Sequence, residues 1–331
     1  MTEHHIMPEH RIQHPASGVP SPGYVELHCH SAYSLLDGAS LPEDLVDRAV
    51  ALGHSALALT DHDDLGGIVA FAQAAHEKGL AGIVGAEITV GAPSRGRGKE
   101  PLRKGAPLKE PLFKEPLPKE PLRKESLLSK SPLPDPLHHI VLLAEDREGY
   151  GNISTLITRS RMDNPRGQPR VSLDTIAQHA RGLFALTGCP RGWIPSLVAR
   201  GDMDGAREAA AELRDMFDGR LAIECWDHGL AEERALIPHL IAIAHSLGVP
   251  WVVTNDVHYA VPEARVAHDV LCALRHERTL AEMGTSLRHN GEWYLKSAAR
   301  MWRRWRQRPD GLRATLEIAE RCAFRMRDLR P

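Results

Sequence analysis

The stretch Tyr24-Val25-Glu26-Leu27-His28-Cys29-His30-Ser31 decides the fold, because a short apolar run ends there in two imidazoles. Side chains alternate along an extended segment, so His28 and His30 project from the same face. The neutral imidazole nitrogen is a common protein ligand of divalent transition ions. The chain holds 19 His, however, so this pair alone is a weak indication of a metal site.

The same pattern, an apolar run that meets ligand-type residues, recurs along the chain. The further runs are 56–62, 81–87, 139–144, 183–189 and 250–258, with another strand expected at Leu221. An imidazole begins the run at 139, whereas Glu87, Cys189 and His258 end theirs. Continuous apolar runs separated by helical patterns are typical of parallel strands buried on both faces.

The segments between these runs have helical periodicity. Residues 42–52 place Leu45, Val46 and Ala49 on one helical face, and Pro42 suits the first turn. Similar patterns occur at 67–78, 205–217 and 232–247, with a poorly phased one at 172–180. About seven strand–helix units can be counted in this way. Polar residues gathered at the strand ends favour a closed α/β barrel with its site at that end.

Four short motifs carry a resemblance to a known family. They are His28-Cys29-His30 followed by Ser-Leu-Leu-Asp-Gly at 34–38, Thr-Asp-His at 60–62, Gly-Ala-Glu at 85–87, and Asn-Asp-Val-His at 255–258. From about Tyr24 to its end, the chain resembles the PHP (polymerase and histidinol phosphatase) domains. It is most similar to the N-terminal PHP module of bacterial DNA polymerase III alpha subunits and error-prone C-family polymerases. The resemblance implies a distorted, TIM-like (β/α)7 barrel, in agreement with the count of strand–helix units.

The resemblance also implies a site for two or three divalent ions, expected to be zinc, manganese or iron. Carried over position by position, its ligands are His28, His30, Asp37, His62, Glu87, His139, Cys189, Asp256 and His258. Glu87 and Asp256 are the expected catalytic residues, because each can bridge two ions that activate a hydroxide. Cys189 stands where some relatives use His, and a thiolate there favours zinc over magnesium. The set is intact, and buried imidazoles and carboxylates without a metal would cost several kcal/mol in desolvation.

The chemistry that follows is phosphoester hydrolysis, and within the polymerase branch the implied substrate is a DNA 3′ end. We therefore expect a 3′→5′ exonuclease that acts in proofreading during replication or repair. A small-molecule phosphatase of the histidinol phosphatase type is the alternative enzyme. A metal-stabilised module that docks on a split DNA polymerase, on its palm subunit or on the sliding clamp, and hydrolyses nothing, is the non-enzymatic alternative.

The chain divides into segments of different composition. Residues 1–23 are expected to be a disordered tail, in spite of four His among Pro, Ser and Gly. Residues 24–276 are expected to form the metal-binding barrel, interrupted by a low-complexity, disordered insertion at 91–136. This insertion repeats Lys-Glu-Pro-Leu, which predicts a solvated extended spacer, with a lid or a partner tether as the alternative. Residues 277–331 are expected to be a small, basic helical extension.

The extension holds the only basic, aromatic stretch, and its candidate DNA contacts are Trp302, Arg303, Arg304 and Arg306. The alternative is a surface helix whose tryptophans pack inward. Glu224, Asp227 and His228 also follow a strand, and either support the metal site or cap local structure.

Composition is that of an ordinary protein: 331 residues, 42% hydrophobic, with a formal net charge of −2. No run is long and apolar enough to cross a membrane, and the N-terminus lacks an apolar signal region. Five scattered cysteines fit a reducing compartment, so a cytoplasmic location is expected. Relatives continue into a polymerase palm, whereas this chain stops at Pro331, so no polymerase activity of its own is expected.

Overall fold

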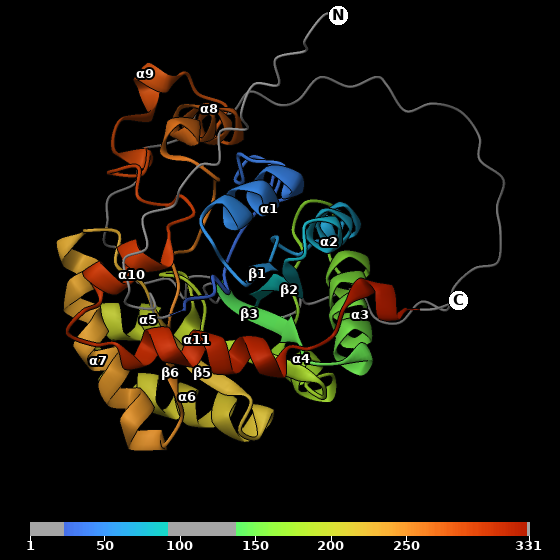
Figure 1. The fold of residues 1–331 in the computed structure, drawn as a ribbon. Helices are drawn as coiled ribbons and strands as arrows, with labels where there is room; N and C mark the ends of the chain where they lie inside the picture. The colour runs from blue at the N-terminus through green and yellow to red at the C-terminus, as the bar shows by residue number, and fades with distance from the viewer. Residues whose placement is uncertain (1–22, 92–136, 330–331) are drawn as a thin grey trace, which may run out of the picture.

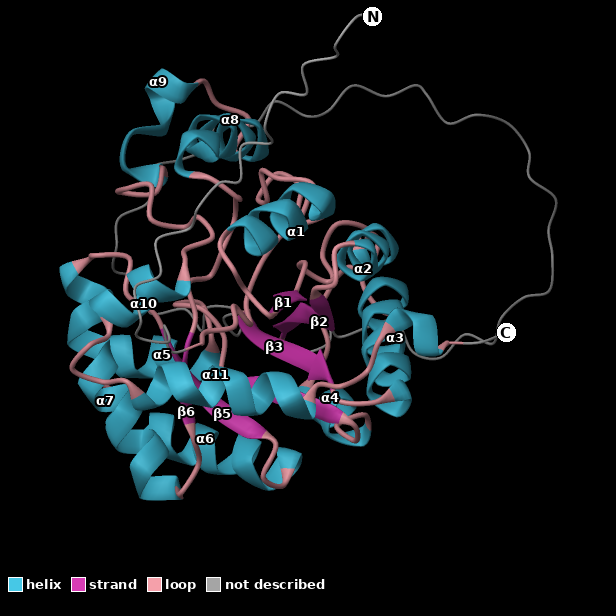
Figure 2. Ribbon diagram, in the orientation of Figure 1, coloured by secondary structure: helices cyan, strands magenta, loops and turns pink. Residues whose placement is uncertain are grey.

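The computed structural model describes residues 23–91 and 137–329. The tail expected at 1–23 and the insertion expected at 91–136 therefore lie outside the described residues, apart from Gly23 and Gly91. The strands form one curved sheet with helices packed around it (Figure 1, Figure 2). They follow chain order across the sheet: β1 Ala56–Leu59, β2 Ala81–Val90, β3 His138–Ala144, β4 Leu183–Leu186, β5 Leu221–Cys225 and β6 Trp251–Val253.

The segment 24–30 closes this sheet into a barrel. On one side it pairs in parallel with β1, through a bridge between Glu26 and Leu57. On the other side it pairs in parallel with the residues that follow β6, through a bridge between Cys29 and Val257. The stretch that carries the first His pair is thus the seventh stave, and the predicted distorted (β/α)7 barrel is confirmed.

The strands read as apolar runs because both of their faces are covered. Every residue of β1, β4 and β5 is buried. Each strand contributes one or two side chains to a central cluster, which includes Leu27, Ala58, Ile83, Val141 and Leu186. The alternate side chains pack under the surrounding helices in a second, larger cluster.

β3 corrects the expectation that all strands are parallel. It runs antiparallel to both β2 and β4, whereas the pairs β1–β2, β4–β5 and β5–β6 are parallel. A strand buried on both faces has the same apolar pattern in either direction, so the sequence could not reveal this reversal. Because β3 is reversed, its first residues lie at the barrel end where the parallel strands finish, and His139 pairs with Thr89 beyond Glu87.

The helices predicted from periodicity are confirmed within a few residues. They are α1 Pro42–Ala51, α2 Ile68–Glu77, α4 Leu173–Gln178, α6 Met203–Phe217 and α7 Ala231–Leu247. Three further α-helices were not predicted: α3 Arg147–Met162, α5 Trp193–Ala199 and α8 Arg265–Arg275. Glycine and β-branched residues weaken the helical pattern of α3, which begins where Asp146 accepts a hydrogen bond from the Gly149 N–H at 2.9 Å.

The residues after 276 are largely helical, as expected, and return to the barrel. They form α9 Leu280–Met283, α10 Ala298–Arg304 and α11 Asp310–Arg321, with 3-10 turns at η2 Gly284–Ser286 and η3 Met326–Asp328. A further 3-10 turn, η1 Pro262–Ala264, directly precedes α8. α11 runs across the barrel (Figure 1), where Ala314 and Ile318 join the central cluster. The Thr315 hydroxyl accepts a hydrogen bond from the Val25 N–H at 3.1 Å. α11 therefore covers the end of the barrel at which the parallel strands begin. The predicted boundary between a barrel ending at 276 and an extension starting at 277 stays a prediction.

Across residues 23–91 and 137–329, no helix combines the length and the apolar composition that a bilayer span requires.

The packing of α11 on β6 predicts the effect of Gly311→Ala. A methyl group at this position would come within 2.2 Å of the Trp251 ring, so we expect the free energy of unfolding to fall by about 1–3 kcal/mol. Gly151→Ala in α3 is the matched control, because nothing lies within 4 Å of its added methyl group. That variant should gain up to about 1 kcal/mol from helix propensity. Denaturant unfolding measures both, and equal stabilities would contradict the packing described here.

Candidate metal centre

The nine residues expected to bind metal gather at one end of the barrel, from segments far apart in the sequence. Seven of them line a pocket of about 250 Å³: Asp37, His62, Glu87, His139, Cys189, Asp256 and His258. The other two, His28 and His30, are fully buried and contact the carboxylates of this pocket. The structure therefore brings together the whole predicted set.

Glu87 at the end of the parallel part of β2 is the centre of the first group. Its carboxylate oxygens lie 2.6 Å from His62 Nδ1 and 3.0 Å from His139 Nδ1. The Nε2 atoms of His28 and His30 lie 3.5 Å and 3.8 Å from the same carboxylate. Imidazoles from three segments of the chain thus surround one buried acid.

Asp256 in the turn after β6 is the centre of the second group. Its Oδ1 atom lies 3.2 Å from His258 Nε2 and 3.5 Å from His30 Nε2. The backbone of Asp256 has a φ of 43°, in the left-handed region that residues other than glycine rarely adopt. Such backbone strain is concentrated at functional sites, and here it accompanies a turn that presents both Asp256 and His258 to the pocket.

Asp37 gathers a third group, which includes a histidine that sequence reasoning missed. One Asp37 oxygen lies 3.0 Å from His62 Nε2, and the other lies 3.6 Å from His258 Nδ1 and 3.8 Å from His268 Nε2. His268 is buried on α8, and its ring nitrogens lie 3.7 Å from the Cys272 Sγ atom. The spacing of His268 and Cys272, four residues apart, was a signal that could have been found, but neither follows a strand.

Cys189 lies at the side of the pocket, beyond the end of β4. Its Sγ atom is 3.8 Å from His139 Nδ1. Burial and the negative charges of Glu87 and Asp256 raise the pKa of the Cys189 thiol well above its usual range. The thiolate form that binds zinc would therefore need a cation beside it.

The polar atoms of this pocket fit divalent cations. Both oxygens of Glu87 and the Nδ1 atom of His258 are buried yet have no hydrogen-bond partner, although imidazole nitrogens surround them. Buried polar atoms are almost always satisfied, so such orphans call for a partner. Within the described residues, four groups converge to within 4.8 Å, each of two His and one carboxylate, which is a composition of metal sites: His28, His30 and Glu87; His30, Asp256 and His258; Asp37, His258 and His268; and His62, Glu87 and His139.

Part of the pocket is already in the protonation state that binds metal ions, whereas Glu87 raises the pKa of His62 to about 10 against the effect of burial, so a cation would have to displace a proton from that ring. Burial opposes ionisation of Glu87 and Asp256, but the surrounding imidazoles hold the pKa of each carboxyl well below its usual range. Burial and the neighbouring His62 lower the pKa of His30 to about 3, so its ring is neutral. Ionised carboxylates and a neutral imidazole are the forms that bind metal ions.

A buried carboxylate on β5 orients one of the imidazoles. Glu224 Oε1 lies 2.7 Å from His28 Nδ1, and it also accepts a hydrogen bond from the Thr254 hydroxyl at 2.5 Å. This contact leaves His28 Nε2 facing the pocket. The other two residues of this stretch have structural partners. Asp227 pairs with Arg234 at 3.2 Å, and His228 Nδ1 lies 2.8 Å from Glu233.

Two arginines at the rim were also missed. Arg275 on α8 lies 3.1 Å from Asp37, and Arg288 Nη2 lies 2.6 Å from His258 Nε2. Their signal was weak, because arginine is common on surfaces and α8 was not predicted. Both line the pocket and give its mouth a positive charge.

The basic extension presents only some of its candidate DNA contacts. Arg303 and Arg306 are exposed, and they line a separate pocket of about 530 Å³. Arg304 instead donates a hydrogen bond to the Asp227 carbonyl oxygen at 2.6 Å and pairs with Glu292. Trp302 packs against the core, with its Nε1 donating to the Gly23 carbonyl oxygen at 3.2 Å.

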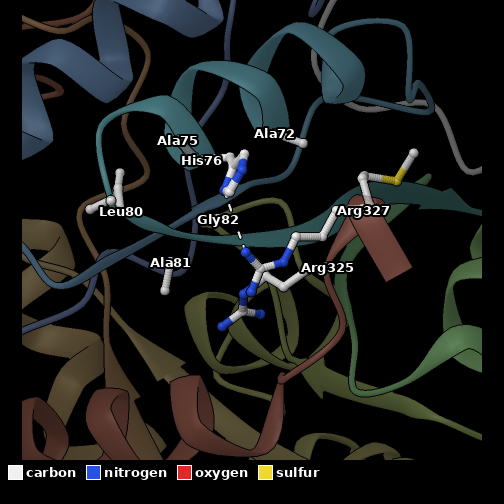
Figure 3. Close-up of a pocket in the computed structure, with 10 residues that line it drawn as sticks. Ala72, Ala75, His76, Leu80, Ala81, Gly82, Arg325 and Arg327 are labelled. Atoms are coloured by element: carbon white, nitrogen blue, oxygen red, sulfur yellow. Dashed lines mark hydrogen bonds between the residues drawn. The ribbon is translucent and has the colours of Figure 1, made fainter. Parts of the chain in front are cut away.

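A further pocket lies away from this centre and contains none of the nine residues (Figure 3). It is lined by the end of α2, the start of β2 and the stretch 325–327, where Arg327 reaches toward His76. β2 starts at the opposite end of the barrel from Glu87, so this pocket has no part in the metal centre.

Lys296 anchors the segment that carries Asp256. Its side chain is only 1% exposed, and its ammonium group donates a hydrogen bond to Asn255 Oδ1 at 2.8 Å. The ammonium group also lies 3.5 Å from Glu292 and 4.5 Å from the centre of the Tyr294 ring. Burial lowers the pKa of Lys296 to about 7, against the opposing effect of Glu292.

This lowered pKa predicts a pH-dependent stability. The unfolded chain keeps the lysine protonated up to about pH 10.4, whereas the folded protein releases the proton near pH 7. The unfolded state therefore binds more protons between these values, and the free energy of unfolding should rise with pH across this window. Lys296→Met should have a smaller slope, and Lys78→Met, at an exposed ion pair with Asp47, should keep the wild-type slope. Urea unfolding at several pH values measures the slopes, and identical slopes for all three proteins would refute the prediction.

The chain is similar to two large bacterial DNA polymerase proteins and to a solved structure. A DNA polymerase III subunit alpha from Treponema pallidum is 34% identical over 304 residues, which are 92% of this chain and 23% of that protein. An error-prone DNA polymerase from Nocardia farcinica is 35% identical over 325 residues, which are 94% of this chain and 28% of that protein. Among solved structures, an amidohydrolase from Chromobacterium violaceum is 19% identical with a TM-score of 0.41, and the match covers 71% of this chain and 88% of that one.

The chain spans about a quarter of the length of the curated relatives it matches. The PHP domain family matches residues 26–228, which include seven of the nine predicted ligands. Asp256 and His258 lie beyond this match and complete the same pocket. With more than half of its length matched and the four motifs in place, the chain belongs to the PHP domain family.

Proposed function

We propose that this domain is a metal-dependent phosphoesterase that acts on DNA 3′ ends. The observation that carries the proposal is the open pocket in which Glu87 and Asp256 converge with five imidazoles. Structural metal sites are closed by protein ligands, whereas catalytic sites keep a side open to substrate. His62 is 22% exposed, so one of the proposed ligands faces the mouth of the pocket.

The nine residues would hold two or three divalent ions, with zinc, manganese and iron as the candidates. Glu87 and Asp256 would bridge between ions, since each lies among several imidazoles. Bound ions would polarise the phosphoryl group. They would also lower the pKa of a bound water toward neutrality. Cys189 would favour zinc over magnesium through its sulfur.

The residues around the ligands have defined tasks in this proposal. Glu224 holds His28 by its Nδ1 atom, so the opposite ring nitrogen is presented to the pocket. Arg275 and Arg288 at the rim would bind the oxygens of a phosphate, which a planar guanidinium fits well. Asp37 at present pairs with Arg275, and this pairing fixes the direction of the guanidinium.

The DNA substrate is supported by the names of the relatives and by the surface charge. The similar proteins are called DNA polymerase III subunit alpha and error-prone DNA polymerase. Exposed Arg303 and Arg306 lie on the same chain and would contact the phosphate backbone. We further propose that the domain works in replication or repair in the cytoplasm, beside a C-family polymerase palm or a sliding clamp.

The first test is the release of label from 3′-end-labelled DNA. The wild-type protein with Mn²⁺ or Zn²⁺ should release label from single-stranded and mispaired ends. The double variant Asp256→Ala/His258→Ala should lose at least about 100-fold of this activity, because the proposed ions contribute several kcal/mol to the barrier. Equal release by both proteins would indicate a contaminating nuclease.

If neither protein releases label and the DNA stays intact, the proposed exonuclease activity is wrong. Assays on small phosphate monoesters would then separate a histidinol phosphatase type of enzyme from a metal-stabilised module that docks on a split polymerase. In the second case the double variant should lose thermal stability and no activity.

Glu224→Gln tests whether the contact to His28 supports metal binding. The amide keeps the shape of the side chain but removes its charge, so we expect metal affinity to fall by about 10–100-fold. Glu233→Gln is the matched control, because Glu233 is a buried acid that contacts a different histidine, His228. Competition with a chromogenic chelator measures both affinities, and an equal loss in the two variants would argue against an orienting role for Glu224.

A further inference from the structure

A second hollow adjoins the metal centre. It has a volume of about 680 Å³ and shares His62 with the metal pocket. Tyr33 and Leu35, from the loop that follows the stave 24–30, form its apolar wall. Arg161 and Arg166, at the end of α3 and beyond it, line the hollow as well. We name this hollow the His62 groove.

The apolar wall is exposed, yet the loop that carries it is held in place. Tyr33 is 41% exposed and Leu35 is 81% exposed. The buried Asp61 carboxylate accepts hydrogen bonds from the hydroxyls of Ser31 and Ser34, each at 2.7 Å. Large apolar side chains kept in water by a fixed loop indicate a binding surface.

Two glycines support the ring of Tyr33. A methyl group at Gly67 would come within 2.8 Å of the ring, and one at Gly66 within 2.9 Å. The ring therefore rests directly on the backbone at the start of α2. This support limits its motion, so a planar ligand could stack on the ring at a small cost in conformational entropy.

One cation of the groove is free to bind an anion. Asp63 accepts two hydrogen bonds from Thr89, at 2.9 Å and 2.6 Å, and Asp64 forms an ion pair with Arg161. Both acids are thus satisfied. Arg166 is exposed and, among residues 23–91 and 137–329, has no ion pair or hydrogen bond, so it is available to a phosphate.

We propose that the His62 groove binds the terminal nucleoside of the substrate, with its base against Tyr33 and Leu35 and its 5′-phosphate, the scissile one, within reach of Arg166. The shared His62 places the scissile ester between this groove and the metal pocket. The proposal rests on the phosphoesterase function proposed above and adds a subsite for the nucleobase. Stacking on an aromatic ring suits any base, so the subsite selects nucleotides without selecting a sequence.

Two esters with the same leaving group test this subsite. The p-nitrophenyl ester of thymidine 5′-phosphate carries a nucleoside, whereas methyl p-nitrophenyl phosphate does not. In both, water adds to phosphorus and p-nitrophenolate leaves. Tyr33→Ala should lower kcat/KM about tenfold for the thymidine ester and leave the methyl ester unchanged. Tyr33→Phe should retain wild-type values, because the stacking ring is kept.

A binding measurement keeps the test independent of hydrolysis. Fluorescence anisotropy of a labelled oligothymidylate, with a chelator present, measures how tightly the metal-free protein binds the oligonucleotide. Tyr33→Ala and Arg166→Ala should each weaken binding about tenfold. Val50→Ala, at an exposed apolar position near the end of α1, should bind like the wild type.

The outcomes separate the subsite from the proposed function. Equal losses on the two esters, or wild-type binding by Tyr33→Ala, would overturn the subsite. If the wild type hydrolyses neither ester, the phosphoesterase fails, and the anisotropy series alone decides whether the groove binds nucleotides.

Discussion

The structure depends on one electrostatic constraint, the burial of Glu87 and Asp256 among imidazoles. Glu87 is fully buried and has four imidazole nitrogens within 3.8 Å of its oxygens, but none in hydrogen-bonding geometry. A buried charge must be paired, and pairing by distance alone is poor compensation for lost hydration. Cations placed among these atoms would satisfy carboxylates and imidazoles together. The cluster is therefore understandable as a set of ligands and hard to explain as core packing.

The barrel is the means by which such a cluster can be assembled. The stave 24–30 closes the ring between β1 and the residues after β6, and the same stave carries His28 and His30. Closure thus fixes two imidazoles against Glu87 on one side and Asp256 on the other. The reversal of β3 has a similar effect, because the first residues of an antiparallel strand lie at the barrel end where the parallel strands finish. A loss of closure would separate the proposed ligands as well as expose the core.

The sequence was sufficient to predict which residues gather at the end of the barrel and insufficient for what surrounds them; that these residues bind metal stays a prediction. Residues at strand ends have positions that follow from the strand itself, so the His28–His30 pair, Glu87 and His258 could be placed by pattern. The direction of β3 could not, since burial on both faces hides it. His268 and Arg275 lie on α8, whose approach to Asp37 depends on tertiary folding. Arg304 looked like a surface cation, yet it is bound to Asp227 and Glu292, which no local pattern reveals.

The contrast between the buried residues of the pocket and the residues at its mouth supports a catalytic role over a purely structural one. His28, His30 and Glu87 have no exposed surface, and their orientation is fixed by buried partners such as Glu224. A metal site that only stabilised the fold would need no residues beyond such buried ones. Instead, His62 and Asp37 continue it outward to a mouth lined by Arg275 and Arg288, which neither the core nor the closure of the barrel requires. Arginines at the mouth of a metal-compatible pocket would attract an anion, which supports the phosphate ester substrate proposed above.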